Sequence, residues 1–156
     1  MNNVYKQYGF TLLELLLVVA IIAILASAIA PVSSRLFSSA QLNENAASIV
    51  QTLRTARQRS VARFNDTTHG VYFEINEGAD RFILYQGTSY ATRNSAYDRI
   101  EILDDSITMT TNISGNEVTF FEGNGTPSAT GTITLNHQVY GSESVSVDAR
   151  GKIEEN

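Results

Sequence analysis

The sequence predicts an α+β fold, with a long N-terminal helix (a transmembrane half plus an amphipathic half) packed on an antiparallel β-sheet domain. Two observations carry this prediction. Residues 33–64 contain neither Gly nor Pro and repeat apolar side chains at steps of three and four. After residue 69 the apolar period becomes two, in short runs rich in β-branched and aromatic residues. One helix followed only by strands is typical of the α+β class.

The chain is long enough for one soluble domain beside an anchor-like segment. Of its 156 residues, roughly 120 remain after the apolar segment, which suits a single small domain. The net charge of -5 argues against general attraction to nucleic acid or anionic lipid. The chain has no cysteine, so it offers neither a disulfide framework nor a thiolate site. Nothing in the composition implies a cofactor.

The N-terminal apolar segment, residues 10–30, is long enough to cross a bilayer. As a helix its 21 residues would span roughly 31 Å, the thickness of a hydrocarbon core. We therefore expect a short leader at 1–9 and a transmembrane helix at 10–32.

A cleaved secretory signal is the rival interpretation of the same segment. Residues 26–28 and 28–30 both have the small-x-small form that signal peptidase uses. Against it stand the length of the apolar run, a leader whose only basic residue is Lys6, and the carboxylate of Glu14 inside the run.

Glu14 needs an explanation, because a carboxylate within a membrane span costs a few kcal/mol and usually has a partner. In one interpretation Glu14 reaches the headgroup region and has no role. In the other, cleavage between Gly9 and Phe10 creates an ammonium group at Phe10, and Glu14 pairs with that group on a neighbouring subunit.

Pro31 is expected to kink the helix. It lacks an N–H and clashes with the carbonyl four residues back, so the bend should fall around Ser27, at the membrane surface. The alternative is a simple helix stop at the interface, although a helical pattern resumes after Pro31.

The stretch "GFTLLELLLVVAIIAILASAIAP" resembles the class III signal of type IV pilins and type II secretion pseudopilins. The shared features are a short polar leader ending in Gly9, then Phe10, a Glu at the fifth mature position (Glu14) and a Pro at the twenty-second (Pro31). The resemblance implies that prepilin peptidase cleaves after Gly9 and methylates the new terminus at Phe10. It also implies that Glu14 registers subunits entering the fibre.

Residues 33–64 form the second, amphipathic half of the helix and open the globular domain. The apolar stripe is small and is interrupted by Asn43, which suits packing against a sheet on one side and against other helices on the other better than a long coiled coil. Its predicted positions are Leu36, Ala40, Asn43, Ala47, Val50, Leu53, Ala56 or Arg57, and Val61.

Residues 65–156 are predicted to hold the strands. The segment "EGAD" signals a hairpin between the first two runs, and residues 88–99 are predicted as a long loop. The predicted strands are "GVYFEIN", "RFILYQG", "RIEIL", "SITMTTNI", "EVTFFE" and "TITLNH", with two more around Arg150 and Gly151 in "SVSVDARGKIEEN".

A weaker resemblance extends over this domain. The segments "RTARQRSVARF", "GVYFEI", "VTFFEGNGTPSATGTITL" and "VSVDARGKI" are similar to the GspH/FimT branch of minor pseudopilins and minor pilins. That branch has a Phe-x-x-x-Gly element before a Gly-initiated strand and closes with a Gly-Arg-like strand. Here Gly151 is followed by Lys152, and the absence of cysteine argues against a major pilin.

Basic residues offer the one candidate binding surface. Four arginines crowd the end of the helix, where they could bind phosphate or an acidic neighbour, or could simply face solvent and complement the helix dipole. These are Arg54, Arg57, Arg59 and Arg63. The candidate contacts for an anion or DNA are Arg54, Arg57, Arg150 and Lys152.

Other chemistry has little support in the sequence. "GNG" at 123–125 precedes no helix and no Gly-Lys-Ser/Thr, so it is predicted to be a turn. Asp104 and Asp105 lack the regular spacing of a calcium site, and no metal site is expected. His69 and His137 are far apart, are expected in loops or at strand ends, and accompany no nucleophile motif.

We therefore interpret the chain as a structural subunit rather than an enzyme: a minor pilin or pseudopilin of a type IV pilus or type II secretion pseudopilus. The resemblance implies a single-pass protein of the bacterial inner membrane with its C-terminal domain outside the cytoplasm. Its expected partners are other pilin subunits, prepilin peptidase and the inner-membrane assembly platform. A DNA-uptake receptor is the alternative function, and a membrane-anchored or secreted enzyme is a third.

Overall fold

The structure is a computed structural model that describes residues 10–75, 78–138 and 140–156; for residues 27–35 it describes the helix but not the side chains. The chain divides into two compact units, residues 1–37 and 38–156. The predicted leader, including Gly9, lies outside the described residues. Within the part of the chain that is described, no helix has the length and hydrophobicity that a membrane crossing requires.

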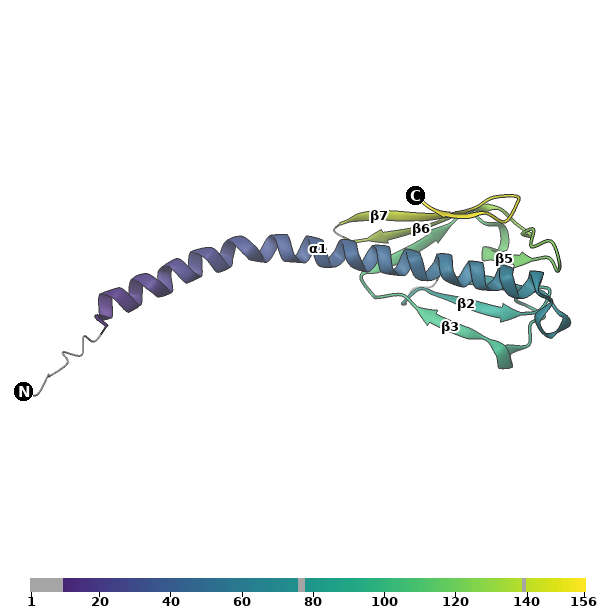
Figure 1. The fold of residues 1–156 in the computed structure, drawn as a ribbon, viewed down its shortest axis with the longest axis horizontal. Helices are drawn as coiled ribbons and strands as arrows, with labels where there is room; N and C mark the ends of the chain where they lie inside the picture. Colours follow the sequence, from purple (N-terminus) through teal and green to yellow (C-terminus); the bar gives the residue numbers. More distant parts are fainter. Residues whose placement is uncertain (1–9, 76–77, 139) are drawn as a thin grey trace, which may run out of the picture. The chain divides into compact units, whose positions relative to one another are not determined.

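Helix α1, Leu12–Val61, is 50 residues long (Figure 1). It begins after Thr11, whose Oγ1 accepts a hydrogen bond from the backbone N–H of Glu14 at 3.2 Å. The helix ends three residues before the predicted position, because Arg63 adopts a left-handed conformation (φ 51°, ψ 42°) that stops the helical hydrogen-bond ladder. A 3-10 turn, η1 (Phe64–Asp66), follows.

All the predicted strands are present, and all pair antiparallel, but they form two four-stranded sheets rather than one. The first has the order β3-β2-β1-β5 and the second β4-β6-β7-β8. The strands of the first sheet are β1 (His69–Glu74), β2 (Arg81–Gln86), β3 (Arg99–Ile102) and β5 (Glu117–Phe120). Those of the second are β4 (Ile107–Thr111), β6 (Gly131–His137), β7 (Gly141–Val147) and β8 (Ile153–Glu155).

Within the unit 38–156 both sheets pack on the helix and share one core. In Figure 1, β2 and β3 lie on one side of α1, and β6 and β7 on the other. Buried side chains from every strand except β3 meet the helix: Val71, Phe73, Phe82, Leu84, Ile107, Met109, Val118, Phe120, Ile133, Leu135, Val145, Val147 and Ile153. The α+β prediction is confirmed.

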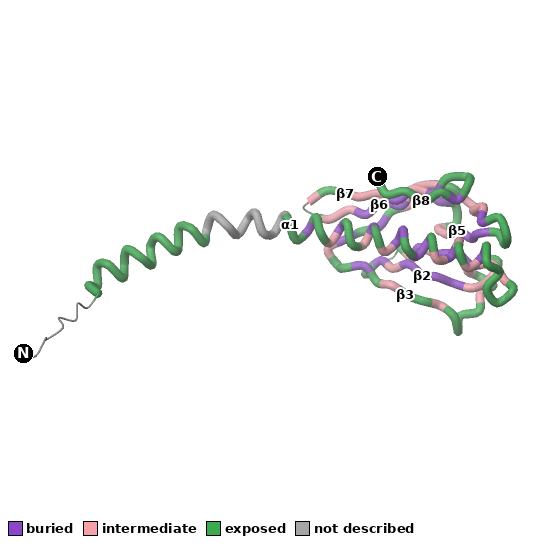
Figure 2. The backbone as a smooth tube through the Cα atoms, in the orientation of Figure 1, coloured by how far each residue is buried: buried purple, intermediate pink, exposed green. Residues whose placement is uncertain are grey.

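The predicted apolar stripe of the helix was wrong over residues 36–47 and at Val61, and correct over residues 50–56. Figure 2 shows buried and exposed positions alternating along the part of α1 that belongs to the domain. The buried positions are Ser38, Leu42, Ala46, Ile49, Val50, Thr52, Leu53, Ala56 and Ser60. The positions Leu36, Ala40, Asn43, Ala47 and Val61 are exposed, and only Val50, Leu53 and Ala56 are shared with the prediction. The small and polar residues of the predicted stripe gain little free energy from burial, whereas burial of Leu42 and Ile49 removes far more apolar area from water. The large apolar residues therefore decide which face of the helix is buried.

The predicted loop at 88–99 contains a short 3-10 helix, η2 (Ser95–Tyr97), and is tied to the first sheet by aromatic stacking. The ring of Tyr90 stacks on Tyr72, with centroids 3.8 Å apart. The guanidinium of Arg93 lies 3.6 Å from the Tyr90 ring centroid, and its Nε donates to Asp98 Oδ2 at 2.8 Å. These contacts hold the loop over the sheet face that carries Tyr72.

Candidate functional site

The N-terminal motif leaves its apolar surface uncovered within its own unit. Phe10 precedes the helix and is 80 % exposed, and every described side chain from residue 10 to 26 is exposed. Gly9 lies outside the described residues and the side chain of Pro31 is not described, so cleavage at Gly9 and the kink at Pro31 stay predictions. The described part of this helix, residues 10–26, therefore presents a continuous exposed apolar surface.

Glu14 has a local role that the sequence analysis missed. Thr11 and Glu14 stand at the N-cap and third positions of α1, which is the Thr-x-x-Glu spacing of a capping box. A carboxylate in the first turn also complements the positive end of the helix dipole. Thr11 therefore caps the helix through the backbone N–H of Glu14, and the Glu14 carboxylate favours the first turn through the helix dipole.

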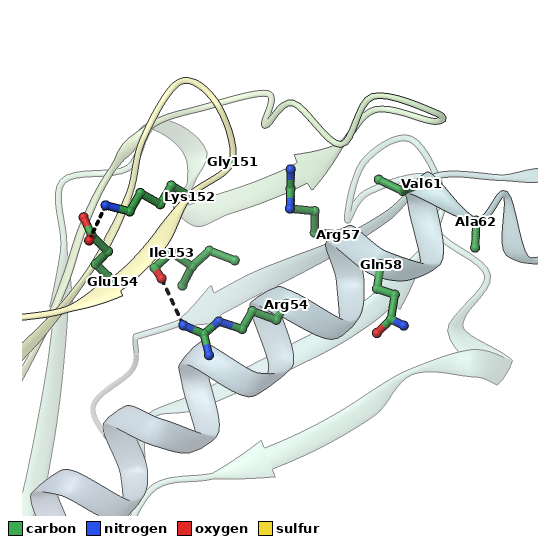
Figure 3. Close-up of a pocket in the computed structure, with 9 residues that line it drawn as sticks. All are labelled: Arg54, Arg57, Gln58, Val61, Ala62, Gly151, Lys152, Ile153 and Glu154. Atoms are coloured by element: carbon green, nitrogen blue, oxygen red, sulfur yellow. Dashed lines mark hydrogen bonds and ion pairs between the residues drawn. The ribbon is translucent and has the colours of Figure 1, made fainter.

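The basic candidates of the domain converge on one groove of about 640 Å³ between the end of α1 and the turn that joins β7 to β8 (Figure 3). We call it the basic groove; its lining residues are Arg54, Arg57, Gln58, Val61, Ala62, Gly151, Lys152, Ile153 and Glu154. Three of the four predicted anion contacts, Arg54, Arg57 and Lys152, line it. Arg150 lies in the same turn but is exposed and does not line the groove.

Arg57 is held by two glycines that are far apart in the sequence. Its Nε donates to the carbonyl of Gly125 at 3.1 Å. Gly125 (φ 65°) and Gly151 (φ 74°) both have left-handed backbones. A Cβ on Gly125 would come within 3.1 Å of Arg57 Nε, and a Cβ on Gly151 within 2.8 Å of the same atom. The two glycines thus leave the space that the Arg57 side chain occupies; we call this arrangement the glycine clamp.

The other two cations of the groove, Arg54 and Lys152, each have a partner within the domain. Arg54 Nη2 donates to the carbonyl of Ile153 at 3.3 Å. Lys152 forms an ion pair with Glu154, and the hydrogen bond from the ammonium to that carboxylate raises the pKa of Lys152.

The turn beside the groove carries a carboxylate that is also engaged. Asp148 Oδ1 accepts the backbone N–H groups of Lys152 at 2.7 Å and Arg150 at 2.8 Å. These two bonds, the first above all, lower the pKa of Asp148. Asp148 therefore stays ionised and shapes the turn that presents Gly151 and Lys152.

The four helix arginines do not form a single patch. Arg59 lies over the ring of Phe64, 5.6 Å from its centroid, and Arg63 occupies the left-handed turn after the helix. Only Arg54 and Arg57 line the groove. The predicted cluster therefore divides into Arg54 and Arg57, which line the groove, and Arg59 and Arg63, which do not.

His69 is the first residue of β1, as expected of a strand end, but it is buried in the domain rather than exposed. It is 1 % exposed, and neither ring nitrogen has a hydrogen-bond partner within the described structure. Burial, followed by the positive charge of Arg59, lowers its pKa. His137 ends β6. Nothing links the two histidines into one site.

The remaining candidates behave as turns. Asp104 Oδ1 accepts from the backbone N–H of Ser106 at 2.9 Å and from its hydroxyl at 2.7 Å, so this carboxylate closes a local turn. No cluster of three or more potential metal ligands occurs among the described residues. Gly123 and Gly125 have positive φ values, which confirms the turn predicted at "GNG".

Comparison with known proteins finds one similarity in the N-terminal sequence and another in the fold. Residues 5–30 match the prokaryotic N-terminal methylation motif. No curated protein matches the chain significantly. Among solved structures, two crystal forms of the type IV minor pilin FimU from Pseudomonas aeruginosa (strain PAO1) are similar, with TM-scores of 0.56 and 0.58 and identities of 18 % and 16 %. They cover 74 % and 76 % of this chain and 92 % and 90 % of FimU.

A minor pseudopilin has a similar fold at a lower sequence identity. The minor pseudopilin EpsH from the type 2 secretion system of Vibrio cholerae matches with a TM-score of 0.55 and 10 % identity, over 74 % of this chain and 96 % of EpsH. At these identities the likeness establishes the fold. The chain is therefore pilin-like: it joins an N-terminal methylation motif to the fold of minor pilins and minor pseudopilins.

Proposed function

We propose that this protein is a non-enzymatic structural subunit, a minor pilin or minor pseudopilin of the GspH/FimT kind. The observation that carries the proposal is the combination of the methylation motif at 5–30, which includes the start of helix α1, with a C-terminal domain of minor-pilin fold into which α1 continues. Neither feature alone points to a fibre, because the motif is short and the fold likeness is remote. Together they match the architecture of subunits that are processed at one end and exposed at the other.

In this proposal residues 10–32 hold the chain in the bacterial inner membrane as a single span, with the C-terminal domain outside the cytoplasm. Prepilin peptidase removes the leader after Gly9 and methylates Phe10. The exposed apolar surface of residues 10–26 then leaves lipid for the helical core of the fibre, at the assembly platform, where it meets other pilin subunits.

The mature N-terminus tests this proposal. The chain is expressed in a strain that has prepilin peptidase, and its terminal peptide is identified by mass spectrometry. We expect a terminus at Phe10, heavier by one methyl group, and no processing in a matched peptidase-deficient strain. A mature terminus beyond Ala26 would return the segment to an ordinary secretory signal and remove the basis for a fibre subunit.

Glu14 has two proposed functions in this scheme, which act at different times. Before cleavage its position in the capping box supports the first turn of α1. After cleavage the ammonium of Phe10 on an adjacent subunit gives the carboxylate a partner inside an apolar environment, where an unpaired charge is costly.

A DNA-uptake receptor is the second candidate, favoured by the convergence of Arg54, Arg57 and Lys152 on one groove. Non-specific DNA binding requires several free cations on one surface. Within residues 67–156, however, four of the five basic side chains already have carboxylate partners: Arg81 with Glu74, Arg93 with Asp98, Arg99 with Glu101 and Lys152 with Glu154. We therefore expect weak DNA binding or none.

A mobility shift of the full chain in detergent with duplex DNA, at low and near-physiological salt, decides between the two candidates. Micromolar binding that weakens steeply with salt and disappears in the Arg150→Ala, Lys152→Ala double variant would place the receptor function first.

A further inference from the structure

We propose that the basic groove receives an acidic side chain, with an apolar neighbour in its sequence, from an adjacent subunit of the fibre. This inference rests on the proposed function and specifies one of the contacts that a fibre subunit would make. It is carried by three features of the groove: a preorganised guanidinium, an apolar floor, and the shortage of any extended basic surface around it.

The guanidinium of Arg57 is positioned before any ligand arrives. Its Nε donates to the Gly125 carbonyl at 3.1 Å, and the glycine clamp lies against the side chain at its Cγ, Cδ and Nε atoms. Among the described residues no partner is seen for the two Nη groups of Arg57. A guanidinium fixed at Nε and open at both Nη groups presents a fork of parallel N–H donors, which matches the two oxygens of a carboxylate.

Arg54 places a second positive charge on the same groove, and Lys152 lines it as one half of an ion pair with Glu154. Figure 3 shows Arg54 reaching from α1 toward Ile153, and Lys152 directed toward Glu154. Because Glu154 is already paired with Lys152, its charge is largely compensated. An incoming carboxylate would therefore meet a net positive site that contains one neutralised ion pair.

The floor of the groove is apolar. Val61, Ala62 and Ile153 line it beside the cations, and the side chain of Val61 is 42 % exposed. A mineral anion or a phosphate would leave this surface wet. A peptide that carries an aliphatic or aromatic residue next to its Asp or Glu would cover it and would gain about 25 cal/mol for each Å² of apolar surface removed from water.

The surroundings of the groove favour a protein ligand over nucleic acid. Arg150 directly precedes the lining residue Gly151, and its turn also contains the ionised carboxylate of Asp148. Glu155 lines the adjoining groove along α1. A DNA backbone extends its negative charge well beyond the length of a 640 Å³ groove and would meet these carboxylates. A single inserted side chain would not. The bulk net charge of -5 opposes a polyanion in the same way.

Site-specific photo-crosslinking in cells that assemble the fibre tests the inference. A benzoyl-phenylalanine is placed at Gln58, which is exposed and lines the groove, and in a matched strain at Thr110, which is exposed on β4. We expect Gln58 to crosslink to another subunit of the same fibre, at a peptide with Asp or Glu within one or two residues of the crosslinked position. Thr110 should not produce this product.

The charge dependence of that crosslink supplies the second arm. In an Arg54→Gln, Lys152→Gln background, which leaves the glycine clamp intact, we expect the yield from Gln58 to fall about tenfold, as the loss of one charge-assisted hydrogen bond would cause. An Arg57→Lys background, which keeps the charge but removes the fork, should lower the yield similarly.

Each other outcome overturns the inference. Crosslinking of Gln58 to DNA, to a peptide without a nearby carboxylate, or to nothing in fibres that contain the protein would exclude the proposed ligand, and so would a yield unchanged by the charge variants. If instead the protein is neither cleaved at Gly9 nor found in fibres, the proposed function fails, and this result is separate because it is measured on the N-terminus and on fibre fractions.

Discussion

Replacement of Gly151 by alanine should destabilise the domain through two effects that a control variant can separate. The first is conformational: Gly151 has φ 74°, where an alanine costs roughly 1–2 kcal/mol. The second is steric, because the new Cβ would meet the carbonyl oxygen of Gly125 at 2.5 Å and Arg57 Nε at 2.8 Å. The first of these atoms belongs to backbone and cannot move away cheaply.

The expected magnitude follows from these contacts. Forcing a methyl group into packed atoms typically costs about 1–3 kcal/mol. Displacing Arg57 from Gly125 would lose a further hydrogen bond, worth about 1 kcal/mol. Gly151→Ala should therefore lower the free energy of unfolding by about 3–6 kcal/mol in total, a large share of the stability of a small domain.

Gly115→Ala is the matched control. Gly115 has nearly the same backbone angle (φ 72°), and its added Cβ would meet only Glu117 Cγ at 3.9 Å. It should therefore cost only the conformational part, roughly 1–2 kcal/mol. The difference between the two variants measures the steric part together with the lost hydrogen bond, about 2–4 kcal/mol.

Urea unfolding of the full chain in mild detergent provides the measurement. The chain has seven tyrosines and no tryptophan, so tyrosine fluorescence can follow the transition. Midpoints are compared at constant m value, so that a change in stability is distinguished from a change in the unfolded state. If the two variants differ by less than about 0.5 kcal/mol, the glycine clamp has no energetic role and the reasoning about Arg57 is refuted.

Three further outcomes are expected. Glu14→Ala should leave cleavage at Gly9 intact but reduce incorporation into fibres, measured by immunoblot of sheared fibre fractions; wild-type incorporation would leave Glu14 with only its capping role. Leu42→Ala should cost about 2–5 kcal/mol in urea unfolding because Leu42 is buried, whereas Leu36→Ala, at an exposed position, should cost under about 0.5 kcal/mol; equal effects would contradict the observed stripe. His69 has a lowered pKa in the folded state, so the unfolded state binds more protons, and stability should decline as the pH falls from about 6.5 toward that lowered value. His69→Leu should remove this slope between pH 7 and 5 and His137→Gln should not, and an unchanged slope in His69→Leu would show that His69 is not its source.

The sequence by itself determined the class of the fold and the order of its elements. The change of apolar period from 3.6 to 2 near residue 69 located the helix and every strand, because this period follows directly from backbone geometry and needs no knowledge of the partner elements. The N-terminal motif was equally local, since its residues lie in one contiguous stretch. These features can be predicted because each depends on neighbours within a few positions.

The phase of the helix and the division of the strands were decided by tertiary structure. Leu42 and Ile49 are buried because two sheets approach α1 from different sides, and a helix segment rich in Ala and Ser has no strong stripe of its own to indicate that direction. Likewise, alternation shows which strand residues share a face, but it does not show which strands pair, since pairing depends on long-range packing.

The candidate site shows the same division most clearly. Arg54, Arg57 and Lys152 could be selected from the sequence as cations, but their meeting in one groove depends on the packing of the β7–β8 turn against the end of α1. Gly125 and Gly151 both stand in recognisable sequence motifs, but the sequence does not show that both lie against Arg57. Arg57 and Gly125, for example, are 68 residues apart in the chain. Local propensity reports that a glycine permits a turn, and only the folded chain decides which side chain fills the space that the glycine leaves.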